Sequence, residues 1–326
     1  MIERRAMLSG TAVAAATILA SQQAQAEETP IWSQEYTGIK QGGVNLAIYR
    51  KRVGPPDGKP RPILFFVHGS TASARPTYDL TIPGRDDVSM MNVAARWGYD
   101  VWAMDHEGYG KSSRTEGNSN IASGVEDLKV AGDLILKETG EQRMHMMGES
   151  SGALRVGGYA MARPDRVGRL VLQAFTYTGQ GSGTLSKRAE QAEYYRTHNR
   201  RPRDAAMLNS IFTRDKPDTT DQDVIDAFIK AEMPFGDSAP AGTYLDMTVN
   251  LPVVHPDKVT APVLLISGQY DGIASMDDIC NFFKVLPNGD RQVTIVPGAA
   301  HVLVSSKQRF TFWKILKDWI ERPTNG

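Results

Sequence analysis

Short apolar runs alternate along the chain with segments in which apolar residues recur at helical spacing. Runs such as residues 63–67 contain no polar position, which is typical of strands buried on both faces of a sheet. Six strands, most of them predominantly apolar, are predicted after an N-terminal hairpin at 35–39 and 44–50; they lie at residues 63–67, 101–104, 144–147, 167–174, 262–267 and 292–296. The alternation predicts an α/β protein with a mostly parallel central sheet of about eight strands, flanked by helices.

Residues 176–250 break this alternation. They contain helical patterns, prolines and seven aromatic residues, but no strand-like run. We therefore predict a helical cap at 176–250, inserted into a core made of residues 27–175 and 251–326. The charges of the cap are segregated, with six basic residues in 187–203 and five aspartates in 215–226. We interpret these runs mainly as solvated helix faces that attract each other. The alternative is a basic rim that draws anionic substrates.

A strand, a sharp turn and a helix meet at Gly148-Glu149-Ser150-Ser151-Gly152. A G-x-S-x-G sequence in this context is typical of a nucleophile elbow, with Ser150 at its tip. Residues two before and two after the serine pass close to neighbouring backbone, which favours glycine there. The N–H of Ser151, at the start of the helix, would face a developing oxyanion. An oxyanion hole needs a second N–H, for which we predict Ser70, after the strand at 63–67.

Two further polar residues follow predicted strands of the same sheet. Asp271 lies in the loop after residues 262–267, and His301 follows residues 292–296. Because the carboxyl ends of parallel strands share one edge of a sheet, Ser150, Asp271 and His301 can converge. His301 would accept the serine proton and Asp271 would orient the imidazole, so Ser150 could form an acyl-enzyme.

These motifs together resemble the α/β-hydrolase family, in the family's order. The matching pieces are His68-Gly69, the turn from Asp105 to Ser112, the elbow, Gly268-Gln269-Tyr270-Asp271 and Gly298-Ala299-Ala300-His301. The resemblance covers about residues 34–321 apart from the cap. It implies that Ser150, Asp271 and His301 are nucleophile, acid and base. A serine at the elbow argues against the epoxide hydrolases and dehalogenases of this fold, which use aspartate there.

Four other residues are candidates for the substrate pocket: Thr71, His106, Glu149 and Tyr177. Thr71 follows the predicted oxyanion residue, and Tyr177 is the first aromatic residue of the cap. His106 stands where the family often has arginine. Glu149 would bring a carboxylate beside the nucleophile. We favour a structural role for Glu149 over that of a group with a raised pKa near the substrate.

The first 26 residues have the features of an export signal. Arg4-Arg5 precedes a weakly apolar run and the small-residue site Ala24-Gln25-Ala26, a pattern that resembles a twin-arginine signal. We expect its removal and a periplasmic or secreted protein. The formal net charge of zero gives no reason to expect a nucleic-acid partner, and no apolar run is long enough to span a membrane.

The sequence thus predicts an exported serine hydrolase that cleaves a small-molecule carboxylic ester. We expect no cofactor and no metal, since the histidines show no close ligand spacing. A lactonase or a C–C bond hydrolase could use the same three residues. A peptidase or amidase remains open, as does a non-catalytic binding protein on the hydrolase fold. The sequence does not predict the oligomeric state.

Overall fold

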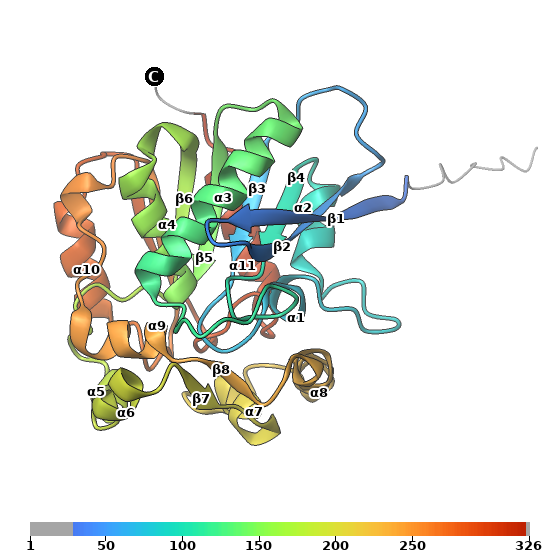
Figure 1. Ribbon diagram of the computed structural model, residues 1–326. Helices are drawn as coiled ribbons and strands as arrows, with labels where there is room; N and C mark the ends of the chain where they lie inside the picture. Colours follow the sequence, from blue (N-terminus) through green and yellow to red (C-terminus); the bar gives the residue numbers. More distant parts are fainter. Residues whose placement is uncertain (1–28, 324–326) are drawn as a thin grey trace, which may run out of the picture.

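An eight-stranded sheet forms the centre of the molecule in the computed structural model, which describes residues 29–323 (Figure 1). Its strand order is β1-β2-β4-β3-β5-β6-β9-β10. The first two strands pair antiparallel, as do β2 and β4, and all later pairs are parallel. The predicted α/β fold with a mostly parallel sheet is confirmed. The strands are β1 (Ile31–Lys40), β2 (Val44–Val53), β3 (Ile63–Val67), β4 (Asp100–Met104), β5 (Met144–Glu149), β6 (Val167–Gln173), β9 (Val263–Gly268) and β10 (Arg291–Val296).

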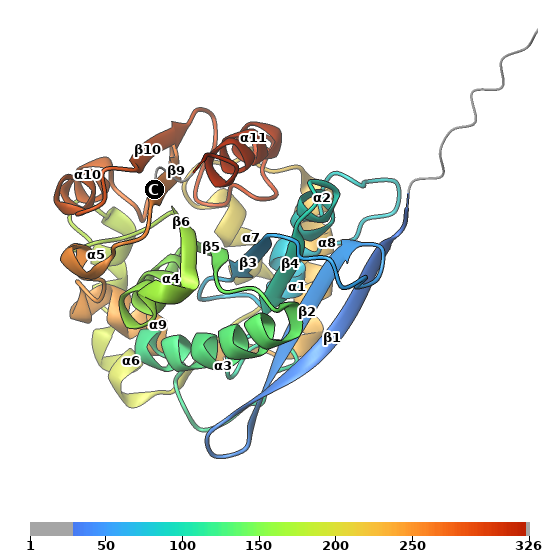
Figure 2. The same ribbon diagram turned by 90° about the horizontal axis from the view of Figure 1, so that it is seen from above.

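Helices cover both faces of the sheet (Figure 2). On one face, Ile63, Phe65 and Val67 of β3 join a core with α3 (Ile121–Thr139), α4 (Ser151–Ala162) and α10 (Met276–Val285). On the other face, Leu64 and Phe66 join a core with α1 (Ala74–Tyr78), α2 (Met90–Arg96) and α11 (Arg309–Ile320). Side chains alternate between the faces of a strand, so a continuous apolar run supplies both cores at once.

The start of α3 differs from the sequence prediction. The sequence Ser123-Gly124-Val125-Glu126 has the pattern of a capping box and predicts Ser123 as the N-cap, but the helix begins three residues earlier. Asn120 is the N-cap, and its side-chain oxygen accepts a hydrogen bond from the Ser123 N–H at 2.8 Å. Asparagine caps as well as serine does, and Asp246 of the cap accepts the Ile121 N–H, which fixes the earlier start. At α10, Ser275 is the N-cap, and its hydroxyl accepts a hydrogen bond from the Asp278 N–H.

The segment 176–250 forms a separate layer against one end of the sheet (Figure 1). Besides helices it contains a two-stranded antiparallel sheet, so the expectation of a segment without strands is wrong. These strands are three residues long and rich in arginine and proline, which gives no apolar run to detect. The elements are α5 (Gly183–Ala189), α6 (Ala192–Thr197), β7 (Arg200–Pro202), α7 (Ala205–Thr213), α8 (Gln222–Glu232), β8 (Ser238–Pro240) and α9 (Gly242–Leu245).

The cap contacts the loops that follow the parallel strands. Arg203, between β7 and α7, donates to the Thr71 carbonyl in the loop after β3, and Glu232 of α8 accepts from Ser73 in the same loop. The carboxyl edge of the sheet therefore lies beneath the cap. The predicted export signal at residues 1–26 lies outside the described residues. No helix among residues 29–323 is both long and apolar enough to cross a membrane.

Candidate active site

Ser150 occupies a strained turn between β5 and α4. Its φ of 56° and ψ of −120° lie outside the regions that residues other than glycine usually adopt. A Cβ on Gly148 would lie 2.2 Å from the Gly152 carbonyl oxygen, and one on Gly152 would lie 2.3 Å from that of Val67. Both contacts are with backbone that cannot move away, so the elbow needs glycine at these two positions. The turn lifts the Ser150 side chain clear of the sheet, as nucleophilic attack requires.

His301 and Asp271 form a hydrogen-bonded pair at the ends of β10 and β9. The His301 Nδ1 lies 2.9 Å from Asp271 Oδ1, and the Asp271 side chain is fully buried. The backbone N–H groups of Ile273 and Ala274 also donate to this carboxylate, as does the Ser267 hydroxyl. Burial by itself would raise the pKa of Asp271, but His301 and the backbone donors hold it below its usual range. An ionised Asp271 fixes the proton on Nδ1 and leaves Nε2 free to accept one.

Ser150 and His301 line the same cavity, which we call the catalytic cavity. Ser70, Thr71 and Glu149 line it as well. The structure thus brings together Ser150, the imidazole that Asp271 orients and the loop after β3. A base beside a serine on an elbow is the arrangement that acyl transfer uses.

Two backbone N–H groups, one on the residue after Ser150 and one in the loop after β3, are candidates to bind an oxyanion. Ser70 follows β3 and Ser151 is the first residue of α4. Neither N–H has an acceptor among the described residues. Gly69 permits the close approach of the two loops, because a Cβ there would lie 3.2 Å from the Glu149 carbonyl oxygen. Ser70 and Ser151 thus remain the candidates for the oxyanion hole, each with a backbone N–H that no group in residues 29–323 accepts.

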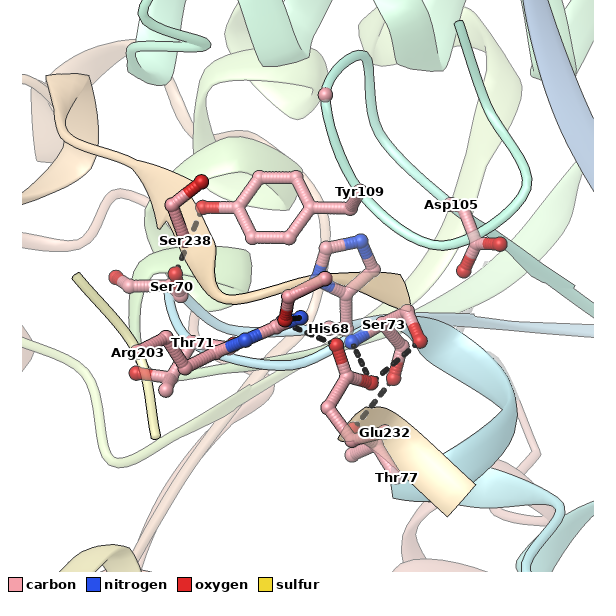
Figure 3. A network of polar contacts seen from close by, with 12 residues as sticks. His68, Ser70, Thr71, Ser73, Thr77, Asp105, Tyr109, Arg203, Glu232 and Ser238 are labelled. Atoms are coloured by element: carbon pink, nitrogen blue, oxygen red, sulfur yellow. Dashed lines mark hydrogen bonds and ion pairs between the residues drawn. The ribbon is translucent and has the colours of Figure 1, made fainter. Parts of the chain in front are cut away.

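The loop that carries Ser70 is held from both sides. On the core side, Tyr109 donates to the Ser70 carbonyl at 2.7 Å. On the cap side, Arg203 and Glu232 form a buried ion pair against Thr71 and Ser73 (Figure 3). Glu232 accepts from both the N–H and the hydroxyl of Ser73, at 2.9 and 2.6 Å. The sequence analysis missed Arg203 and Glu232, because nothing local shows that they pair across 29 positions.

The comparisons with known proteins agree with this geometry. The sequence profile of the family described as "Serine aminopeptidase, S33" matches residues 58–308. The chain belongs to this family. The match extends over β3, the elbow, the cap and the loops that carry Asp271 and His301, so it covers every element of the site. The protein is therefore a hydrolase of the α/β-hydrolase fold.

Relatives of this S33-family chain include hydrolases that are named for a C–C bond substrate class rather than for peptides. A 2-hydroxy-6-oxononadienedioate/2-hydroxy-6-oxononatrienedioate hydrolase from Cupriavidus pinatubonensis is 27% identical over 222 residues, covering 60% of this chain and 68% of that protein. A second such hydrolase, from Pseudomonas putida, is 23% identical, and the match covers 80% of this chain and 88% of that protein. The solved structure of an E-2-(acetamidomethylene)succinate hydrolase superposes with a TM-score of 0.63 at 18% identity, covering 90% of this chain and all of that one. The structural likeness shows the fold.

Glu149 is buried at the catalytic cavity of this S33-family hydrolase, with its Oε2 unpartnered among the described residues. Burial raises the pKa of its carboxyl group to about 7, with a small further contribution from Asp271, while His301 acts in the opposite direction. A structural role predicts partners from backbone or an arginine, and the structure has none for Oε2. These observations favour the alternative, a carboxyl group with a raised pKa beside the nucleophile.

Two of the predicted pocket residues do not line the cavity. His106 is fully buried, and its Nδ1 lies 3.1 Å from Asp127 Oδ2. Burial, with Arg155 nearby, lowers the pKa of His106 to about 4, so it is a neutral core residue. The Tyr177 ring packs edge-on against Phe282, with ring centroids 5.3 Å apart. By contrast, Thr71 does line the cavity, and its hydroxyl shares a hydrogen bond of 2.6 Å with the Tyr244 hydroxyl.

A second cavity, the cap cavity, lies between the cap and the loop after β9. It has a volume of about 580 Å³ and shares Thr71, Arg188, Ile211 and Arg214 with the catalytic cavity. Lys187 and Arg201 also line it. The basic run of the cap is therefore not chiefly a solvated face paired with the acidic run. Of that acidic run, Asp221 and Asp223 pair with Arg85 of the core instead.

One group of side chains in residues 29–323 has the spacing of metal ligands. Asp215, Asp271 and His301 place their ligand atoms within 4.8 Å of one another. Asp215 already forms two hydrogen bonds with Arg214, at 2.8 and 3.1 Å, and Asp271 is bonded to His301. A divalent cation would meet the Arg214 charge and would have to displace the imidazole proton. These three side chains therefore fit the roles of a catalytic base and the acid that orients it better than the role of metal ligands.

Proposed function

We propose that the protein is a serine hydrolase that cleaves a carboxylic ester through an acyl-enzyme on Ser150. The observation that carries the proposal is the His301–Asp271 pair, joined at 2.9 Å, beside a serine in an elbow conformation. Two free N–H groups point to the same chemistry, because a tetrahedral intermediate places its negative charge on one oxygen.

The proposed reaction has two halves. Ser150 Oγ attacks the ester carbonyl carbon while His301 Nε2 accepts the hydroxyl proton. The N–H groups of Ser70 and Ser151 stabilise the oxyanion. When the intermediate collapses, the bond to the alcohol oxygen breaks and the imidazolium returns the proton to that oxygen. Water then attacks the acyl-enzyme with His301 as base again, which releases the acid and restores Ser150.

The charges around the site favour an ester over the peptide substrate that the family description suggests. An aminopeptidase must bind the ammonium group of a substrate's amino terminus, which requires a free carboxylate. Asp215 and Asp271 of the cap cavity already have cationic or proton-donating partners. Burial raises the pKa of Glu149, in the catalytic cavity, to about 7, which disfavours a charged carboxylate there. The remaining charged lining is basic, and it would repel an ammonium group.

A second candidate is hydrolysis of a C–C bond, which the similarity to the 2-hydroxy-6-oxononadienedioate hydrolases supports. The same three residues could carry it, with a carbanion equivalent in place of the alkoxide as leaving group. Lactones are a third substrate class, because a lactone is a cyclic ester and the same mechanism would open its ring. A binding protein without catalysis would not need an oriented imidazole beside a strained serine, so we place it last.

We also propose that residues 1–26 direct export and that the mature protein is periplasmic or secreted, through a twin-arginine-type signal. Arg4-Arg5 and Ala24-Gln25-Ala26 support this proposal. Amino-terminal sequencing of the protein from a cell that exports it should find Glu27 first. Replacement of both arginines by lysine should leave the precursor in the cytoplasm, whereas unchanged export would exclude the twin-arginine route.

The test of function is a panel assay of residues 27–326. It includes aryl and alkyl esters, lactones, amino-acid anilides and 2-hydroxy-6-oxononadienedioate, with Ser150→Ala as control. We expect kcat/KM to be highest for an ester and undetectable in the variant. Faster consumption of 2-hydroxy-6-oxononadienedioate than of any ester would favour the C–C hydrolase. Faster release from anilides would favour a peptidase.

A further inference from the structure

The cap cavity adjoins the catalytic cavity in which Ser150 lies. Its walls come from α5, α6, β7, α7 and the loop after β9, and four of its residues also line the catalytic cavity. A volume of about 580 Å³ lies within the range of small-molecule sites. A substrate held at Ser150 can therefore extend into it.

Positive charge dominates this cavity. Its basic residues are Lys187, Arg188, Arg201 and Arg214, and its acidic residues are Asp215 and Asp271. Arg214 pairs with Asp215, and Asp271 is hydrogen-bonded to His301. No carboxylate among the described residues pairs with Arg188 or Arg201. The cavity thus contains unneutralised positive charge, which an anionic ligand would stabilise.

Arg188 and Arg201 are arranged around one tyrosine. Their guanidinium carbons lie 5.0 and 4.4 Å from the centre of the buried Tyr244 ring. Burial lowers the pKa of Arg188, and Arg214 and Arg201 lower it further by repulsion. Burial would raise the pKa of the Tyr244 hydroxyl, but the two arginines hold it below its usual value. Both cations thus lie against the same ring. A guanidinium has five N–H donors, so N–H groups remain for a ligand even where one of them is hydrogen-bonded to the tyrosine hydroxyl.

Tyr244 also connects the arginines to the catalytic loop. Its hydroxyl shares the 2.6 Å hydrogen bond with Thr71, next to the oxyanion residue Ser70. We propose that the cap cavity binds a carboxylate group of the substrate through Arg188 and Arg201, so that the enzyme acts on anionic esters. This inference rests on the proposed hydrolysis at Ser150. A planar guanidinium matches a carboxylate in geometry as well as in charge.

The direct test compares esters that differ only in one charge. The first pair is 4-nitrophenyl hydrogen glutarate and its amide, 4-nitrophenyl glutaramate, with the charge on the acyl side. The second pair is 4-carboxyphenyl and 4-carbamoylphenyl pentanoate, with the charge on the alcohol side. After subtraction of spontaneous hydrolysis, we expect kcat/KM to favour the anion in at least one pair by about ten- to a hundredfold, mainly through KM.

Variants then locate the preference. Arg188→Met and Arg201→Met should each lower the ratio of anionic to neutral kcat/KM by about tenfold or more, and Arg188→Lys should restore part of it. Arg196→Met is the matched control, because Arg196 lies in the same cap, is exposed and pairs with Glu193. Its ratio should stay within twofold of the unaltered protein. A ratio that is unchanged in both methionine variants, with neutral esters still hydrolysed, overturns the proposal.

A binding measurement separates this proposal from the proposed function. In Ser150→Ala, calorimetric titration should show glutarate binding and at least tenfold weaker binding of glutaramide. Adding Arg188→Met should abolish the difference. If no ester is hydrolysed but this pattern holds, the carboxylate site stands and the ester hydrolase fails. If glutarate and glutaramide bind equally, or neither binds, the carboxylate site fails whatever the turnover assays show.

Discussion

The His301 Nδ1 lies 2.9 Å from Asp271 Oδ1, and three further donors hold that carboxylate in place. The two residues come from the loops after adjacent parallel strands, β10 and β9, which pair in register from Arg291 and Val263 onward. The register of the sheet therefore sets the contact that fixes the imidazole. A serine on a third strand end can use the other ring nitrogen.

Replacing Asp271 by Asn should remove the charge that fixes the imidazole proton on Nδ1. We expect kcat to fall by about three to four orders of magnitude, because the wrong tautomer presents an N–H to the serine. Steady-state kinetics on the best ester of the panel measures it. The control is Asp215→Asn, which alters a nearby carboxylate that faces Arg214 and should lower kcat less than tenfold. The reverse order of effects would make Asp215 the orienting acid.

Replacing Glu149 by Gln should change how stability depends on pH. Burial raises the pKa of Glu149 from an ordinary 4.5 to about 7, with Asp271 and His301 as the charged groups that act on it and Tyr78 also nearby. Between about pH 4.5 and 7 the unfolded chain loses this proton while the folded chain keeps it. The free energy of unfolding therefore falls as pH rises through this window.

Glutamine does not ionise, so the stability of Glu149→Gln relative to the unaltered protein should rise by up to about 3 kcal/mol from pH 4.5 to 8. Urea denaturation at half-unit pH steps measures the difference, in which contributions from other groups cancel. A difference that is constant across this range would mean that Glu149 ionises normally.

Replacing Gly152 by Ala should disrupt the elbow. The new Cβ would lie 2.3 and 2.6 Å from the carbonyl oxygens of Val67 and His68. We expect a loss of about 3 kcal/mol or more in the free energy of unfolding, or no folded protein, because backbone must move apart. The control is Gly289→Ala, where a Cβ would meet nothing within 4 Å. Equal denaturation midpoints for the two variants would refute the packing argument.

Replacing Arg203 by Met should leave Glu232 buried without its counter-charge. Both side chains are almost fully inaccessible, at 2% and 0% exposure, so we expect a loss of about 3–5 kcal/mol. Burial already raises the pKa of Glu232, which shows that the folded protein disfavours the ionised carboxylate there. The double variant Arg203→Met/Glu232→Met should recover part of the loss. A loss below about 1 kcal/mol in the single variant would mean that solvent reaches Glu232.

The sequence is sufficient to predict the core because its features are local. A strand such as residues 63–67 is apolar throughout, since it faces two layers, and the elbow has glycine wherever backbone passes close by. Asp271 and His301 follow from the same rule, because parallel strands end at one edge.

The cap could not be predicted in the same way. Its short strands β7 and β8 contain arginine and proline, and they form through tertiary contacts rather than propensity. The sequence also does not show whether a side chain points into the core or into a cavity. His106 and Tyr177 turn into the core, whereas Arg188 and Arg201 turn toward the cap cavity. The charge pattern of the cap was visible, but which charges pair depends on how helices dock, and the acidic run pairs with Arg85.

Every step of the proposed mechanism depends on Ser150 being an activated nucleophile. The direct measurement is labelling of folded residues 27–326 with a fluorophosphonate, followed by mass mapping of the modified peptide. We predict one adduct on Ser150, none after heat denaturation, and slower labelling in Asp271→Asn. No adduct in a folded protein, or an adduct on Ser151 or another serine, would contradict the account.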